Sequence, residues 1–113
     1  MIQSKENMQH QTTFLLQQCE EGMLFRIKDN EPSCFHLASG GSRTRAKLCI
    51  DAGLALHLST KTIVALASTI ELLHNASLVH DDLQDADISR RGRESVWKKY
   101  GKSHAVCAGD VMI

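Results

Sequence analysis

The longest periodic stretch of the sequence, residues 61–85, constrains the fold more than any other feature. Its apolar residues recur close to the 3.6-residue period of a helix, at Ile63, Leu66, Ala67, Ile70, Leu73 and Leu78. This spacing predicts a helix with one apolar face. Ser59 or Thr60 precedes the stretch and is a suitable N-cap. We therefore expect one long helix from about Lys61 to Asp85, with the rest of the fold packed around it.

The remainder of the chain also favours helices. Helical spacing predicts helices over residues 7–27 and 44–57, a short helix beginning near Pro32, and a fourth helix beginning near Glu94 or Lys102. No stretch of useful length alternates as a strand does, and the aromatic content is only 4%, which suits helix packing better than a sandwich or barrel. We predict an all-α fold in a single small domain that spans residues 1–113.

Charge and hydropathy bear on partners and location. The formal net charge is zero, so no overall basic character predicts binding to nucleic acid or to an anionic membrane. No continuous apolar run approaches the roughly 20 residues of a membrane span, and the polar N-terminus lacks a signal-peptide core. The four cysteines are widely spaced, as expected for thiols in a reducing compartment. These features predict a soluble cytoplasmic protein with no nucleic-acid partner and no membrane span.

Charges are segregated in residues 78–93, "LVHDDLQDADISRRGR", where the acids come first and the arginines second. Asp81 and Asp85 are one helical turn apart, about 6 Å along the axis, and His74 and Ser77 precede them on the same face. Carboxylates this close repel one another unless they are neutralised. Oxygen ligands at this spacing suit Mg²⁺, which pairs carboxylates with substrate phosphates, and arginine forks bind phosphate oxygens. The stretch therefore predicts a diphosphate held through magnesium.

A second group of basic residues lies in "GGSRTR", residues 40–45, where two glycines precede Arg43 and Arg45 at a helix start. This is a second place for an anion. Each of these groups, taken alone, also has a purely structural interpretation. The acids would be a solvated helix end, and the glycines would be a loop. His74 would be a hydrogen-bonded boundary residue, and His80 would orient the aspartates or cap a neighbouring helix. The combination favours one ligand, a diphosphate.

With these motifs, the sequence resembles the trans-isoprenyl diphosphate synthases, or polyprenyl synthetases, over residues 32–113. The elements "GGSRTR", "ELLHNASLVHDDLQD", "RRGR" and "AVCAGDVMI" occur in the order of that family. The resemblance implies an antiparallel helix bundle of the isoprenoid synthase type with a deep central cavity. It also implies an enzyme, a Mg²⁺-dependent prenyltransferase that condenses an allylic prenyl diphosphate with isopentenyl diphosphate and releases diphosphate.

The resemblance further implies roles for individual residues. Asp81 and Asp85 would bind the Mg²⁺ ions that grip the allylic diphosphate, with Asp82 assisting. Arg90 would contact the same diphosphate. Arg45, His74 and Arg91 would bind isopentenyl diphosphate, and Arg43 would support that site.

Product length and assembly follow from the same resemblance. In the family, bulk at the fourth and fifth positions before the first aspartate closes the floor of the product pocket. Here these positions hold Ser77 and Ala76, which are both small. We therefore expect a product longer than farnesyl diphosphate. Homodimers are usual in the family and are expected for the parent enzyme.

The sequence departs from the family pattern in two ways. Ser42 stands where the family usually has lysine, which removes a cation from the isopentenyl diphosphate site. Members of the family are considerably longer and carry a second aspartate-rich motif, whereas only Asp110 follows Asp87 here. We interpret the chain as the N-terminal part of a synthase. The alternatives are a non-catalytic synthase-like subunit or inactive fragment that binds prenyl diphosphate or a full-length partner, a class I terpene cyclase with a similar aspartate motif, and a structural helical protein.

Overall fold

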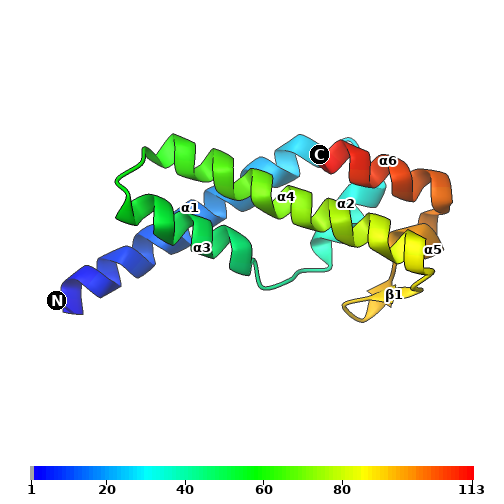
Figure 1. The fold of residues 1–113 in the computed structure, drawn as a ribbon, viewed down its shortest axis with the longest axis horizontal. Helices are drawn as coiled ribbons and strands as arrows, with labels where there is room; N and C mark the ends of the chain where they lie inside the picture. Colours follow the sequence, from blue (N-terminus) through cyan, green and yellow to red (C-terminus); the bar gives the residue numbers. More distant parts are fainter. Residues whose placement is uncertain (1) are drawn as a thin grey trace. The chain divides into compact units, whose positions relative to one another are not determined.

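The computed structural model describes residues 2–113, and nearly all of its regular structure is helical (Figure 1). The elements are α1 (Ile2–Ile27), α2 (Glu31–Ala38), α3 (Thr44–Ala55), α4 (Thr60–Asp85), β1 (Ser89–Arg90), β2 (Arg93–Glu94), α5 (Val96–Tyr100) and α6 (Lys102–Met112). The prediction of an all-α fold is confirmed. The two strands form a short antiparallel hairpin in which Arg90 pairs with Arg93, and the sequence did not predict it.

Local signals explain where the helices begin. Asn30 caps α2, because its Oδ1 accepts the N–H of Ser33 at 2.9 Å, and Pro32 lies in the first turn as expected. Ser59 caps α4, and its Oγ accepts the N–H of Thr62 at 3.2 Å. Lys102, one of the two expected starts of the last helix, begins α6, and a separate short helix, α5, precedes it. Gly101, at a φ of +97°, separates the two helices. That positive φ favours glycine and ends α5.

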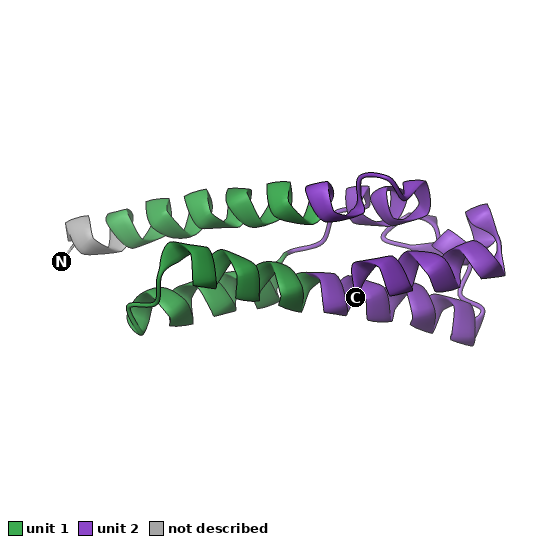
Figure 2. Ribbon diagram, turned by 90° about the horizontal axis from the view of Figure 1, so that it is seen from above, with its two compact units in different colours: residues 1–23, 43–71 green, residues 24–42, 72–113 purple. Residues whose placement is uncertain are grey.

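The chain folds into two compact units, and α1 and α4 each run from one unit into the other (Figure 2). The first unit comprises residues 1–23 and 43–71. Its apolar core is formed by Leu15, Cys19, Ala46, Ile50, Ile63 and Ala67. Gly53 allows the close approach of α3 to α4, because a Cβ there would lie only 2.6 Å from Cγ1 of Ile63.

The second unit comprises residues 24–42 and 72–113, and α2, α5 and α6 pack against one another in it. The hydroxyl of Ser33 in α2 donates to the carbonyl of Ala108 in α6 at 3.1 Å. Gly109 gives α6 close contact with α4, since any side chain there would overlap the ring of His80. Phe35 of α2 packs edge-on against Tyr100 of α5, with ring centroids 5.6 Å apart. These contacts hold the helices that flank the hairpin.

By length and composition alone, α4 is long and apolar enough to cross a membrane. Its most apolar stretch has a mean hydropathy of 1.4, and 39% of that stretch is buried in the structure. A single helix of this kind is a weak indication, because the core helix of a soluble protein has the same length and composition.

Candidate functional site

Asp81 and Asp85 lie on the solvent-facing side of α4, one turn apart as predicted. Within residues 6–113, neither carboxylate forms a hydrogen bond or an ion pair. Two open oxygen donors at this spacing fit a hard cation such as Mg²⁺. The described part of the chain contains no group of three His, Cys, Asp or Glu side chains placed to hold a metal. A metal bound here would take its remaining ligands from a phosphate group or from water.

Asp82 differs from its two neighbours, because it is buried and pairs with an arginine. Arg90 donates from Nη2 to Oδ1 of Asp82 at 2.6 Å and from Nε to Oδ2 at 3.0 Å. This hydrogen-bonded pairing raises the pKa of Arg90 above its usual value; burial acts in the opposite direction, and the charges of Asp87 and Asp81 raise it further. Arg90 is therefore a fixed cation that interacts with the charges of Asp81 and Asp87.

Arg91 occupies the tip of the hairpin and contacts the glycine-rich loop. Arg91 and Gly92 both have positive φ values, 54° and 77°, as a two-residue hairpin turn requires. The Nη1 of Arg91 donates to the carbonyl of Gly40 and, at 3.0 Å, to Oγ of Ser39. A Cβ on Gly41 would lie 2.9 Å from Cζ of Arg91, so glycine allows this approach. The structure thus joins "RRGR" to the glycines of "GGSRTR".

Arg43 and Arg45 lie in the first unit, at the start of α3, whereas the other predicted site residues lie in the second unit. Arg43 forms an ion pair with Glu20 of α1, and only 9% of its side chain is exposed. This pairing holds the guanidinium of Arg43 against α1. Arg45 is exposed in the first turn of α3. The carboxylate of Glu71 accepts the N–H of Ala46 at 2.9 Å in the same turn.

The remaining predicted residues of α4 differ in exposure. Ser77 is exposed and its hydroxyl donates to the carbonyl of His74 at 2.6 Å, while His74 itself is half-buried. Ala76 is buried, so a larger side chain there would first disturb packing, and the prediction about product length depends on Ser77. Nε2 of His80 lies 3.2 Å from the carbonyl oxygen of Val106 and 3.7 Å from Oδ1 of Asp110, so the ring faces α6.

A buried polar pair, His36 and Asn75, lies behind the site and was not predictable from the sequence. Nε2 of His36 in α2 lies 3.0 Å from Oδ1 of Asn75 in α4, and both side chains are buried. Burial lowers the pKa of His36 to about 4, against the opposing effect of the hydrogen bond to Asn75. His36 is therefore neutral at pH 7. The only signal in the sequence was a histidine within an apolar helical pattern, which has no specific meaning.

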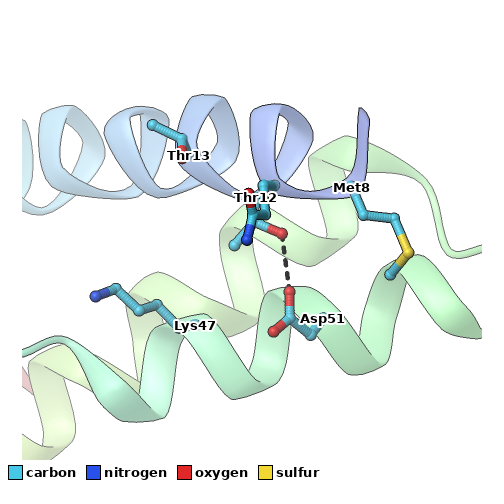
Figure 3. Close-up of a pocket in the computed structure, with 6 residues that line it drawn as sticks. Met8, Thr12, Thr13, Lys47 and Asp51 are labelled. Atoms are coloured by element: carbon cyan, nitrogen blue, oxygen red, sulfur yellow. Dashed lines mark hydrogen bonds between the residues drawn. The ribbon is translucent and has the colours of Figure 1, made fainter. Parts of the chain in front are cut away.

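A groove of about 630 Å³ lies in the first unit and contains none of the predicted site residues (Figure 3). It is lined by Met8, Gln9, Thr12, Thr13, Lys47 and Asp51. The hydroxyl of Thr12 in α1 donates to Oδ1 of Asp51 in α3 at 2.8 Å across this groove. Lys47 points along α3 with its ammonium group away from this hydrogen bond.

Comparison with known proteins adds an independent line of observation. Residues 30–113 match the model of the polyprenyl synthetase family. The chain is 38% identical over 74 residues to the geranylgeranyl diphosphate synthase of Methanosarcina mazei, and 40% identical over 75 residues to a probable farnesyl diphosphate synthase of Sinorhizobium fredii. These matches cover 66% and 65% of this chain, and 23% of each relative.

The fold is also similar to the crystal structure of heptaprenyl diphosphate synthase from Staphylococcus aureus. The TM-score is 0.77 at 26% identity, and the superposition covers 89% of this chain and 34% of that one. In sequence and in structure, the chain therefore spans a minor part of the length of the proteins that it matches.

Proposed function

This chain belongs to the polyprenyl synthetase family, and on that premise we propose that it forms the diphosphate-binding part of a trans-prenyltransferase. The proposed reaction condenses an allylic prenyl diphosphate with isopentenyl diphosphate and releases diphosphate. One observation supports it most strongly. Two open carboxylates, Asp81 and Asp85, share a helix face on either side of Asp82, and the guanidinium of Arg90 is already fixed against Asp82.

Different residues would bind the metal ions and the phosphate oxygens of the leaving diphosphate. Asp81 and Asp85 would hold Mg²⁺, which when bound neutralises negative charge on the diphosphate as it leaves. Arg90 would donate hydrogen bonds to the phosphate oxygens of the allylic substrate, because a fixed cation needs no reorganisation as charge develops. Arg91, held against Gly40 and Gly41, would present its cation to the second diphosphate.

The prenyl chain would lie along the same face of α4. Leu66, Ile70 and Leu73 are exposed and lead by helical spacing toward Ser77 and the aspartates. An apolar surface beside the reacting carbon keeps water away from a carbocation. The small hydroxyl of Ser77 leaves this path open, which supports the expectation of a product longer than farnesyl diphosphate.

The proposal is tested with the 113-residue chain, geranyl diphosphate and Mg²⁺. We expect calorimetry to show Mg²⁺-dependent binding that Asp81→Asn weakens at least tenfold, because it removes one of two metal-binding carboxylates. Asp29→Asn is the matched control, since Asp29 is also exposed but lies between α1 and α2, outside the acidic stretch. We expect it to change binding less than threefold.

Turnover is measured as pyrophosphate release after isopentenyl diphosphate is added. Release that Asp81→Asn abolishes would support catalysis by the chain itself. Binding without release would favour the alternative, a non-catalytic synthase-like subunit. A folded wild-type chain that binds no geranyl diphosphate with or without Mg²⁺ would contradict the proposed function.

A further inference from the structure

Asp82 stands apart in the acidic stretch because its carboxylate is buried. The residue is only 1% exposed, whereas Asp81 and Asp85 on either side are open to solvent. Both of its carboxylate oxygens accept hydrogen bonds from Arg90, at 2.6 and 3.0 Å. A metal ion approaching from solvent therefore meets the other two aspartates and not this one.

The pairing leaves part of Arg90 available to a ligand. A guanidinium carries five N–H groups, and Asp82 takes one from Nε and one from Nη2. Within residues 6–113, the other three N–H groups of Arg90 have no partner. The side chain is 29% exposed, so these donors can reach an anion in solvent while the opposite edge stays bound to Asp82.

We propose that Asp82 is a positioning residue that fixes the guanidinium of Arg90 for the phosphate oxygens of the substrate, and that Asp82 is not a metal ligand. The inference deepens the proposed function and rests on it for the identity of the anion. An arginine held at one edge loses less rotational freedom when its other edge binds phosphate, so less binding free energy is lost to ordering the side chain. The buried carboxylate also keeps the cation in place when no anion is bound.

The positioning itself is tested without any ligand, by ¹⁵N NMR of the arginine side chains. A clamped guanidinium gives a distinct Nε–Hε signal with slow hydrogen exchange, whereas an exposed arginine such as Arg26 exchanges quickly. We expect Arg90 to show the protected signal in the wild-type chain and to lose it in Asp82→Asn. An unprotected Arg90 signal in the wild-type chain would overturn the inference, even if the variant failed to fold.

The consequence for binding is tested with inorganic pyrophosphate. In Asp82→Asn, we expect metal-free affinity to fall about tenfold, the range of one charge-assisted hydrogen bond. Arg90→Gln should give a similar loss, and the double variant should be no worse than Arg90→Gln alone. The gain in pyrophosphate affinity on addition of Mg²⁺ should be unchanged in Asp82→Asn and largely lost in Asp81→Asn. Asp82→Glu keeps the charge and provides a second variant if Asp82→Asn unfolds.

The outcomes separate this inference from the proposed function. Loss of the Mg²⁺-dependent gain in Asp82→Asn, to the extent seen in Asp81→Asn, would make Asp82 a metal ligand and overturn the inference. Additive losses in the double variant would show that Asp82 does not act through Arg90. A protected Arg90 signal in a folded chain that binds no pyrophosphate would contradict the proposed function while supporting the Asp82–Arg90 clamp.

Discussion

His36 is the buried side chain whose protonation most directly affects stability. Burial lowers its pKa to about 4, whereas the unfolded chain should have a pKa near its ordinary value of 6.5. Between these two values the unfolded state binds more protons, so stability is present above pH 6.5 and is lost as the pH falls. We expect His36 to reduce the free energy of unfolding by about 2 kcal/mol between pH 7 and pH 5.

Urea unfolding at the two pH values measures this effect. The matched variant is His36→Gln, which can still donate a hydrogen bond to Asn75 but does not titrate. We expect the pH dependence to be smaller in the variant by about 2 kcal/mol. Equal pH dependence in the two proteins would show that His36 is protonated without penalty, and so is not buried as described.

Substitution by alanine is expected to have opposite effects on stability at two glycines that lie within helices. Alanine is favoured over glycine in a helix by about 1 kcal/mol. At Gly53 the added Cβ would lie 2.6 Å from Cγ1 of the buried Ile63, and such overpacking costs about 1–3 kcal/mol. At Gly22 of α1 the nearest atom is Oγ of Ser68, 3.9 Å away, so nothing opposes the helix preference.

We therefore expect Gly53→Ala to lower the thermal midpoint and Gly22→Ala to raise it. Thermal unfolding followed by circular dichroism measures both. Shortening Ile63 to alanine should remove most of the penalty of Gly53→Ala, because it removes the atom that overlaps. A destabilising Gly22→Ala would show that α1 is not a regular helix at that point.

At the scale of elements, α4 shows how far the sequence could predict burial. Its apolar period correctly predicts a helix ending at Asp85, and Ser59 was one of its two expected N-caps. The buried face, however, includes Glu71, Asn75 and Asp82. These polar residues recur at helical spacing within the apolar pattern, and their burial depends on partners distant in sequence.

Some apolar residues of the same helix were expected to be buried but are exposed. Leu66, Ile70 and Leu73 belonged to the predicted apolar face, yet all three are exposed. Ile63 and Ala67, from the same predicted face, are buried as expected. Hydrophobic period identifies a helix but does not identify which apolar side faces the core when apolar residues occur on more than one side. The position of Asp81 and Asp85, one turn apart on an exposed side of α4, was predictable because helix geometry sets their spacing. The pairing of Asp82 with Arg90 was not, because it depends on the path of the hairpin.

The start of α3 depends on a carboxylate from α4. Arg43 precedes the helix with a φ of 56° and no side-chain cap, and Glu71 accepts the N–H of Ala46 in the first turn. A buried carboxylate there satisfies a helix donor and interacts favourably with the positive end of the helix dipole. We expect Glu71→Leu to lower the free energy of unfolding by about 2 kcal/mol, because the N–H is left unpaired.

Glu71→Gln is the comparison that isolates the charge. Its amide oxygen can still accept the N–H of Ala46, so the loss should be roughly half that of Glu71→Leu. Chemical denaturation gives both values, and hydrogen exchange at Ala46 reports the local bond. Unchanged protection of the Ala46 amide in Glu71→Leu would contradict this account of the helix start.

At the scale of the whole molecule, the chain combines an exposed apolar stripe on α4 with a formal net charge of zero. Leu66, Ile70 and Leu73 lie along one side of α4, with Leu66 and Leu73 each 46% exposed. The formal net charge is zero and the isoelectric point is near 7.0, so little electrostatic repulsion keeps copies of the 113-residue chain apart at neutral pH. Contiguous exposed apolar surface favours association under these conditions.

We therefore expect the isolated chain to self-associate at pH 7, with a weight-average mass in sedimentation that rises with protein concentration. Leu73→Lys should shift association to at least tenfold higher concentration, because it places a charge within the stripe. Ile88→Lys adds the same charge at an exposed residue near the hairpin, outside the stripe, and should have a smaller effect than Leu73→Lys. If both variants reduce association equally, net charge and not the α4 stripe drives it. If the wild-type chain remains monomeric at the highest protein concentration measured, the exposed face of α4 does not need a partner.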